Sequence, residues 1–554
     1  MSEGAAALRE TKIARIGLAL ALALFAFAVW RSLFLIDDAF ISFRYARNWV
    51  EGHGPVYNLG AEFPVEGYSN FSWVVLLAMG LLAGLPLEIF ANGLSVLAAA
   101  GTLCLVYRCL RSKLELDALP TSLALIALAT LPSFHFWASG GLETAFFGLL
   151  LFACWEGLCL PKAPGKQLTQ STARGLGLGL LGGLLVLTRP EGIAWIPGLC
   201  LCAWIARGKH SLRSKGLFLA GTVALALPHL LWRHSFYGEW LPNTVHAKSA
   251  ISSESLSRGA RCLATWGLSA LWPLIACAAP FSTSAGPKRR AALSLITLLA
   301  GGLAYNLLVG GDWMPFFRFL APLSAFFAVG LGLVLSKLGK LPATGLGLVL
   351  AAYAFLPAFN VNLLPQGLRE TLYYREFKVG YQTEHQRWVR GNRIRELNTW
   401  IGRGIEQVMP ADSSWTGGAI GAIGYYSPIY IFGRNGLVHR DVARREVQPG
   451  SQTAGHEKRV PMAYFRDQNP TFYFAQLITA AVPSSGPGFD WAVGKLRDQV
   501  FADPTEAPLR ECTYVEAKAL RDIPGLPEPA TLMILRHTND PRVAMEFWAR
   551  YARD

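Results

Sequence analysis

The N-terminal stretch IARIGLALALALFAFAVWRSLFLIDDAFISFRYARN (residues 13–48) decides the class of fold. Its apolar run, from about Ile13 to Ile36, is long enough for a helix to cross the hydrocarbon of a membrane. Asp37 and Asp38 follow it directly. The basic residues Arg9, Lys12 and Arg15 stand at the start of the run, and no small-residue cleavage site lies before the two acids. We therefore interpret the run as a retained signal anchor.

The composition of the whole chain agrees with a membrane protein. The 554 residues are 52% hydrophobic and 16% charged, with a mean hydropathy of +0.32. These values exclude a secreted mini-domain, a disordered chain and a single soluble core. The net charge of +14 is explained by membrane topology rather than by a nucleic-acid partner. Eight of the nine cysteines lie in or beside apolar runs, which argues against a disulfide framework.

Further apolar runs predict a polytopic α-helical membrane protein with about eleven transmembrane helices. The run Phe71 to Leu85 is treated as a helix at the membrane surface, because the basic clusters of the chain then all fall on one side. That side is the cytoplasm by the positive-inside rule. The other predicted spans lie near 88–107, 118–136, 142–160, 175–188, 191–206, 216–233, 259–283, 291–309, 318–335 and 341–359.

The composition changes at about residue 361. Residues 1–360 are expected to form the membrane domain, with a first outer loop at 37–87, and residues 361–554 a soluble extracytoplasmic domain. Helical patterning at 383–408 precedes a Gly-rich, strand-like stretch at 415–432, which predicts an α/β fold.

The acidic pair Asp37 and Asp38 is the strongest candidate for chemistry. A carboxylate at the end of a membrane span is costly unless it is hydrated, paired with a cation or needed for function. The pair therefore indicates either a solvated helix end or a general base, and the sequence does not separate the two aspartates. A divalent cation held between them is a further alternative, although no metal is required.

Other polar residues gather in the same outer segments. Arg189 and Glu191 flank a proline turn, where Arg189 either pairs with Glu191 or holds a lipid phosphate. Asp312 either caps a loop turn or belongs to the site. The candidate substrate-binding and donor-phosphate residues are Arg44, His53, Glu66, Arg189, Glu191, Asn243, His246, Lys248, Asp312, Arg318, His456 and Lys458.

The string Asp37–Asn48, continued by Glu51–Gly54 and Val65–Asn70, resembles the first outer loop of bacterial GT-C glycosyltransferases. The resemblance is to the arabinofuranosyltransferase-like members, which use a decaprenyl-phosphate sugar. It implies a GT-C fold and a catalytic base at Asp37 or Asp38. Further similar segments are 139–147, 187–192, 237–248, 310–322, 421–427, 436–445 and 455–458.

These observations predict an inverting glycosyltransferase of the bacterial plasma membrane. An outward-facing site has no nucleotide sugars, so the donor must be a sugar on polyprenyl phosphate, with arabinofuranose or another pentose expected. Arg189, Arg318, Lys248 and His246 would hold the phosphate. The acceptor would be an envelope glycan, a lipid or a protein. The main alternative is a transporter or flippase of lipid-linked sugars.

Overall fold

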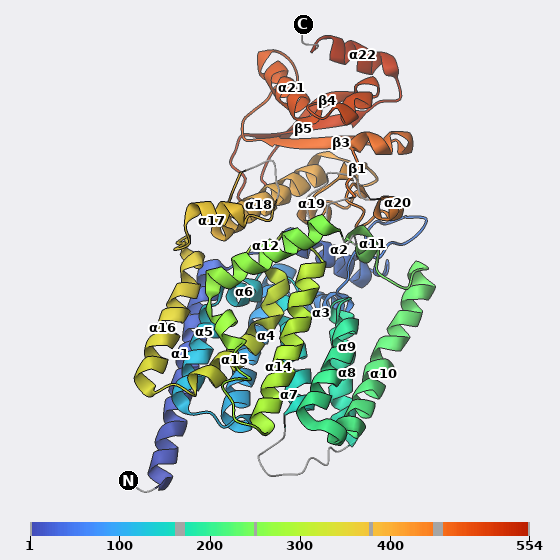
Figure 1. Cartoon of the computed structure of the whole chain (residues 1–554). Coiled ribbons are helices and arrows are strands. Elements are labelled where there is room, and N and C mark those ends of the chain that lie inside the picture. Colours follow the sequence, from blue (N-terminus) through green and yellow to red (C-terminus); the bar gives the residue numbers. More distant parts are fainter. Residues whose placement is uncertain (1–2, 161–171, 249–251, 376–379, 447–457, 552–554) are drawn as a thin grey trace.

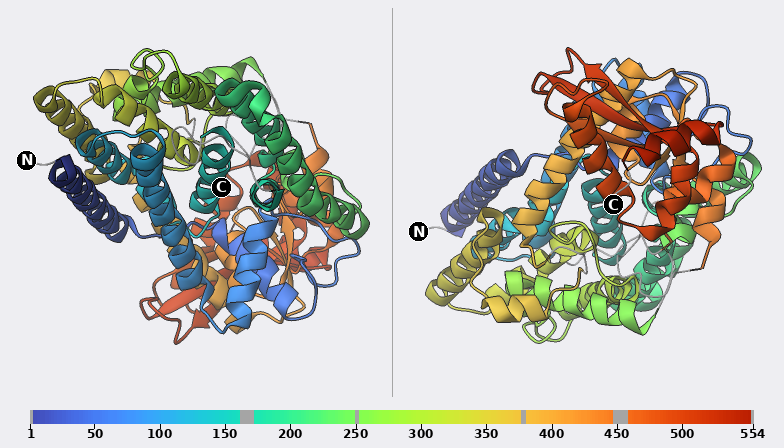
Figure 2. Two further views of the ribbon diagram at one scale, coloured as in Figure 1. Left: turned by 90° about the horizontal axis from the view of Figure 1, so that it is seen from below. Right: turned by 90° about the horizontal axis from the view of Figure 1, so that it is seen from above.

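The computed structural model describes the chain except residues 1–2, 161–171, 249–251, 376–379, 447–457 and 552–554. Long helices form a bundle, and a sheet-containing C-terminal part covers one end of it (Figure 1). The N-terminus lies at the opposite end. Viewed along the bundle, the long helices stand side by side, with α1 at the periphery (Figure 2). We call the end beneath the C-terminal part the outer face.

The helices that run along the bundle are α1 (Glu3–Ser32), α4 (Leu87–Arg108), α5 (Ala118–Thr130), α7 (Thr144–Cys159), α8 (Thr172–Thr188), α9 (Gly192–Arg207), α10 (Leu212–Tyr237), α14 (Pro287–Leu308), α15 (Ser324–Leu335) and α16 (Lys340–Phe355). Shorter helices and those across the outer face are α2 (Ala39–Val50), α3 (Phe71–Leu82), α6 (Pro132–His135), α11 (Asn243–Lys248), α12 (Ser253–Ala270), α13 (Trp272–Ala276) and α17 (Gln366–Thr371). Helical turns of other types are η1 (Cys109–Lys113), η2 (Phe136–Ala138), η3 (Gly208–Ser211), η4 (Arg318–Leu323) and η5 (Leu356–Phe359).

The structure confirms a polytopic helical protein but not the count of eleven spans. Within the described residues, six helices are long and apolar enough to cross a membrane, or seven if the pair bent by 64° at residue 131 is one span. The helices α7 and α8, with 16 and 17 residues, are shorter than that length criterion. The segment Gly192–Tyr237 counts as one long helix, although η3 divides it into α9 and α10.

The prediction of a single span at 259–283 is wrong. Helix α12 begins at Ser253 and ends at Ala270, and the φ of 57° at the next residue, Leu271, stops the helix. The guanidinium of Arg258 donates to the carbonyl of Gly310, 2.8 Å away, so the start of α12 lies at the outer end of α14. Figure 1 shows α12 lying across the outer end of the bundle. Apolar content alone did not reveal that this helix is amphipathic.

Helix α3 does not cross the bundle. Asn70, directly before α3, donates to Glu143 in an outer-face loop. Glu88, in the first turn of α4 just after α3, accepts a hydrogen bond of 2.7 Å from Tyr426 of the C-terminal part. Both ends of α3 therefore lie at the outer face. This agrees with the prediction that residues 71–85 form a helix at the membrane surface.

The basic clusters lie at the end away from the C-terminal part. Arg108 and Lys113 end the segment formed by α4 and η1, and Lys288 begins α14. Lys337 and Lys340 stand between α15 and α16. This grouping at one end is what the charge pattern predicts for a cytoplasmic face.

A five-stranded sheet organises the C-terminal part. The strand order is β2-β1-β3-β5-β4; β1 pairs in parallel with β2 and β3, whereas β5 pairs antiparallel with β3 and β4. The strands are β1 (Ser414–Gly417), β2 (Tyr430–Gly433), β3 (Phe472–Ile478), β4 (Thr513–Leu520) and β5 (Ala530–His537). The helices are α18 (Glu384–Val408), α19 (Gly421–Tyr426), α20 (Arg440–Arg444), η6 (Met462–Gln468), α21 (Pro487–Val500), η7 (Pro504–Glu511) and α22 (Pro541–Ala549).

One apolar core joins the first outer loop to the sheet. Phe40 of α2 belongs to the same buried cluster as Ile401 of α18, Ile423 of α19 and Leu532 of β5. The change of composition near residue 361 therefore marks no break in packing. The acidic pair lies where the first outer loop packs against the C-terminal part.

Candidate active site

The two aspartates occupy the turn between α1 and α2, beneath the C-terminal part. Asp37 is held by three donors: its Oδ1 accepts from Asn398 and from the backbone N–H of Ala422, each at 3.0 Å, and its Oδ2 accepts from the N–H of Gly421 at 3.1 Å. Burial raises the pKa of Asp37, and these hydrogen bonds oppose the rise.

Gly421 is required by the close approach of Asp37. A Cβ at residue 421 would lie 1.9 Å from the backbone oxygen of Asp37, a distance that no packing tolerates. Asp38, the next residue, occupies the N-terminal cap position of α2 and is half-buried. The protein thus fixes Asp37 from the C-terminal part and thereby fixes the backbone on which Asp38 stands.

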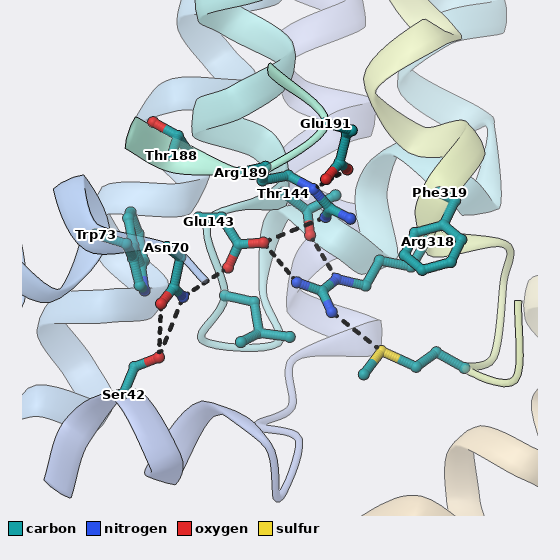
Figure 3. A network of polar contacts seen from close by, with 12 residues as sticks. Ser42, Asn70, Trp73, Glu143, Thr144, Thr188, Arg189, Glu191, Arg318 and Phe319 are labelled. Carbon is teal, nitrogen blue, oxygen red and sulfur yellow. Dashed lines mark hydrogen bonds and ion pairs between the residues drawn. The ribbon is translucent and has the colours of Figure 1, made fainter. Parts of the chain in front are cut away.

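A second group of charges gathers around Glu143, in the loop before α7 (Figure 3). Its Oε1 accepts from Arg318 at 2.6 Å and from Arg189 at 3.2 Å, while its Oε2 accepts from Asn70 at 2.9 Å. Burial alone would raise the pKa of Glu143, but Arg318 and Arg189 outweigh it and the pKa is lowered. Asn70 also exchanges hydrogen bonds with Ser42 of α2, which links this network to the first outer loop.

The network is electrically balanced. Arg189 bonds Glu191 at 2.5 Å as well as Glu143, and Arg318 also donates to the hydroxyl of Thr144 at 3.0 Å. Two guanidinium groups therefore face two carboxylates in a buried setting. The pairing of Arg189 with Glu191 is one of the two alternatives that the sequence left open, and a phosphate would have to compete with Glu143 and Glu191 for these arginines.

Asp312 shapes the loop that carries Arg318. It accepts from the N–H groups of Met314 at 2.9 Å and Phe319 at 3.0 Å, and its own carbonyl accepts from Arg375 at 3.0 Å. Burial raises the pKa of Asp312. Asp312 therefore stabilises the turn of this loop, which is the capping role that the sequence left open as one alternative.

Glu66 and Asn243 meet on the other side of the first outer loop. The Glu66 carboxylate lies 2.7 Å from Arg233, and its backbone carbonyl accepts from the N–H of Asn243 at 3.1 Å. Burial raises the pKa of Glu66 to about 7, although Arg233 opposes the rise. The Asn243 amide donates to the carbonyls of Gly436 and Leu437, so Asn243 joins this loop to the C-terminal part.

Arg44 lies in the packing between the first outer loop and the C-terminal part. Its guanidinium donates to the carbonyls of Tyr57, Gly424 and Ile429 at 2.7, 2.9 and 2.8 Å. The residue is 1% exposed, and its hydrogen bonds satisfy carbonyls of both parts. Arg44 thus has a structural role, and its substrate-binding role stays a prediction.

The remaining predicted residues are more scattered. His53 is exposed on the first outer loop. Lys458 donates to the carbonyls of His246 at 2.7 Å and Ala443 at 2.9 Å. His456 and the side chain of Lys248 lie outside the described residues.

Sequence reasoning missed three residues of this region as site residues. Glu143 is the lone acid between two apolar runs, which was the available signal. Asn398 and Arg233 lie within helices, and nothing in their neighbouring sequence marks them. Across the described part of the chain, no three His, Cys, Asp or Glu side chains come together as a metal site would need.

The fold, a helix bundle covered at one end by a part of the chain that follows the last bundle helix, is of the GT-C type. The crystal structure of ArnT from Cupriavidus metallidurans bound to undecaprenyl phosphate matches 94% of this chain and 97% of its own, with a TM-score of 0.56 and 14% sequence identity.

Two proteins of similar sequence carry more specific descriptions. A terminal β-(1→2)-arabinofuranosyltransferase from Mycobacterium tuberculosis is 33% identical over 242 residues, which are 41% of this chain and 37% of that protein. The enzyme of the same description from Corynebacterium glutamicum is 27% identical over 45% of this chain and 38% of that protein. The matches therefore span less than two fifths of either relative. No protein-family model matches the chain.

Proposed function

We propose that this protein is an inverting glycosyltransferase that moves arabinofuranose or another pentose from a polyprenyl phosphate to an envelope acceptor. The acceptor is a glycan, a lipid or a protein. The observation that carries the proposal is the acidic pair at the outer end of α1, where Asp37 is fixed by Asn398, Gly421 and Ala422. The GT-C fold and the arabinofuranosyltransferase relatives support the reaction class.

The location of the acids supports a lipid-linked donor. The basic clusters support a cytoplasmic position for the opposite end of the bundle in a bacterial plasma membrane, with the outer face extracytoplasmic. Nucleotide sugars are confined to the cytoplasm, so the sugar must arrive on a membrane carrier. Its leaving group is a phosphate that is already stable as an anion. Little general-acid assistance is needed on that side.

The acceptor hydroxyl, in contrast, must lose a proton as it attacks the anomeric carbon. We assign the base to Asp38 and a positioning role to Asp37. The three hydrogen bonds at the two oxygens of Asp37 hold the turn in place, and Asp38 is the next residue on that turn; both residues are half-buried. A positioned carboxylate contributes about a hundred- to ten-thousandfold to the rate. Displacement in one step inverts the anomeric configuration. No cofactor is required.

The Glu143 network is proposed to position the surrounding loops. It connects Ser42 of the first outer loop with Glu143, Arg189 and Arg318 of three later loops. Because its charges balance, we assign the donor phosphate to His246 and Lys248 instead. Arg189 and Arg318 would contact the phosphate only by exchanging their carboxylate partners.

Reconstitution tests the function. The full chain in proteoliposomes is given polyprenyl-phosphate arabinofuranose and arabinan oligosaccharides, and products are followed by mass spectrometry. We expect a pentose to be added, and nuclear magnetic resonance should show an anomeric configuration opposite to that of the donor. Flipping of the donor without transfer to any acceptor would instead identify a transporter.

A further inference from the structure

A cavity of about 230 Å³ lies at one edge of the outer face, apart from the Glu143 network. It is bounded by the end of α1, the turn from α6 to η2, the end of α16 with η5, and the first turn of α18. Its polar lining consists of Arg31, Ser32, His135, His385 and Trp388. In Figure 1 the outer ends of α1 and α16 meet the start of α18 on this side of the molecule.

The polar lining contains one cation, Arg31, and several hydrogen-bonding nitrogen atoms. Among the described residues that line the cavity there is no carboxylate. Burial and the neighbouring charge of Arg31 lower the pKa of His385, which favours the neutral ring beside this arginine. The adjacent Glu384 does not compensate Arg31, because it pairs with Arg375 and accepts from the N–H of Phe316.

Two buried nitrogen atoms in the lining also lack a partner. His135 is 1% exposed and its Nδ1 contacts the hydroxyl of Ser32 at 3.2 Å, but its Nε2 has no hydrogen-bond partner. The indole Nε1 of Trp388 is likewise buried without a partner. An indole nitrogen can only donate. The Ser32 hydroxyl donates to the carbonyl of Ala28, so it accepts from His135 Nδ1, and Nε2 of the neutral ring is an acceptor. Leaving such groups unsatisfied costs about 1–3 kcal/mol each, so a cavity with both an unsatisfied donor and an unsatisfied acceptor is suited to a polar ligand.

The cavity lies at the depth of lipid headgroups. The apolar helices Ala7–Ser32 and Lys340–Phe359 both end at its wall. Trp30, beside Arg31, is 72% exposed, as is typical of aromatic residues at a membrane interface. Phe359 is 39% exposed, and the Arg31 guanidinium lies 5.2 Å from the centre of its ring. An acyl or prenyl chain could leave the cavity along this apolar surface.

The volume limits the size of the ligand. At about 30 Å³ for each water in the liquid, the cavity corresponds to about eight waters. This is room for a phosphate group and the atoms next to it. Pockets that enclose ligands of drug size are larger, at about 300–1,000 Å³. A headgroup therefore fits, and a complete lipid-linked oligosaccharide does not.

We propose that this cavity binds the phosphate group of an anionic membrane lipid, with Arg31 supplying the positive charge and His385 and Trp388 supplying hydrogen bonds. Its lipid chain would lie in the bilayer against α1 and α16. This site is separate from the proposed transfer reaction, since none of its lining residues takes part in that reaction.

Lipid binding to the purified full chain tests the proposal. The protein is titrated with phosphatidylglycerol or phosphatidylcholine, and bound lipid is counted by native mass spectrometry while thermal unfolding is recorded. Arg31→Gln and His385→Gln are compared with Arg390→Gln, which changes an exposed arginine on the same helix as His385. We expect preferential retention of phosphatidylglycerol by the wild type and by Arg390→Gln. In the two cavity variants retention should weaken about tenfold, as for loss of one charged hydrogen bond.

Three results would overturn the proposal. The first is equal retention of phosphatidylglycerol by the cavity variants and Arg390→Gln. The second is equal binding of phosphatidylcholine, which would exclude recognition of an anionic lipid. The third is equal protection of the lipid-free protein by inorganic phosphate, which would identify a soluble anion as the ligand. Unfolding of each variant without lipid reports whether it folds, and His385→Gln decides the question if Arg31→Gln does not.

Discussion

The side-chain amide of Asn398, in the middle of α18, donates a hydrogen bond of 3.0 Å to Asp37 at the end of the first membrane helix. The two residues are 361 positions apart in sequence. This contact joins the C-terminal part to the turn that carries Asp38. The geometry of the proposed base therefore depends on a helix of the C-terminal part.

Replacing Asn398 with alanine tests this dependence. A hydrogen bond to a charged group contributes about 1.5–3 kcal/mol, so Asn398→Ala should lower the stability by an amount of this order and slow the transfer reaction. Arg393→Ala is the matched control, because Arg393 is exposed on the same helix. Thermal unfolding and transfer rates measure the two effects. Wild-type values for both in Asn398→Ala would show that the contact is unimportant.

The close approach at Gly421 predicts a sharp contrast between two glycines. In Gly421→Ala the new Cβ would lie 1.9 Å from the Asp37 carbonyl oxygen, so the turn must move. In Gly418→Ala the nearest atom is 3.9 Å away, at Asn435. We expect the first variant to lose most of its transfer activity and the second to keep it. Similar transfer activity in the two variants would contradict the importance of the close packing between Gly421 and Asp37.

Glu143 should be essential for stability. In Glu143→Gln two buried guanidinium groups lose a shared carboxylate, and breaking a buried ion pair costs about 3–5 kcal/mol. The control is Glu51→Gln, which removes an exposed pair with Arg47 and should change stability by no more than about 0.5 kcal/mol. Denaturation in detergent gives both numbers. An effect of Glu143→Gln as small as the control would contradict the role of the network.

Glu66 predicts a specific pH dependence. Its pKa is about 7 in the folded protein and 4.5 for the ordinary side chain, so the folded state holds the proton more tightly. Its contribution to stability is therefore complete below about pH 4.5 and is lost as the pH rises through about 7. The wild type should lose up to about 3 kcal/mol relative to Glu66→Gln across this interval. Glu62→Gln, an exposed change on the same loop, should behave like the wild type.

Much of the architecture could be predicted from local sequence. Apolar runs and basic clusters reflect the requirements of each single helix in a membrane, so they can be recognised in the sequence. They predicted the division of the helix bundle into an outer face and a basic face. The prediction failed at 259–283, where the helix-stopping backbone at Leu271 leaves no trace in the average hydropathy. The span count was not confirmed either, because short helices such as α7 do not reach the length of a complete span.

The site was less predictable, because its partners are far apart in sequence. Arg44 was flagged as a charge beside the acidic pair, yet its partners Gly424 and Ile429 are about 380 residues away. Glu143 lies 46 residues from Arg189 and 175 from Arg318. Sequence shows that such charges need partners, but only the fold shows which partners they have.

Initial transfer rates of Asp38→Asn in proteoliposomes show whether Asp38 is the base of the transfer reaction, with Asp37→Asn measured beside it for loss of stability. We predict a rate about a hundred- to ten-thousandfold below that of the wild type for Asp38→Asn, with unfolding unchanged. A wild-type rate in a folded Asp38→Asn protein would contradict this role of Asp38.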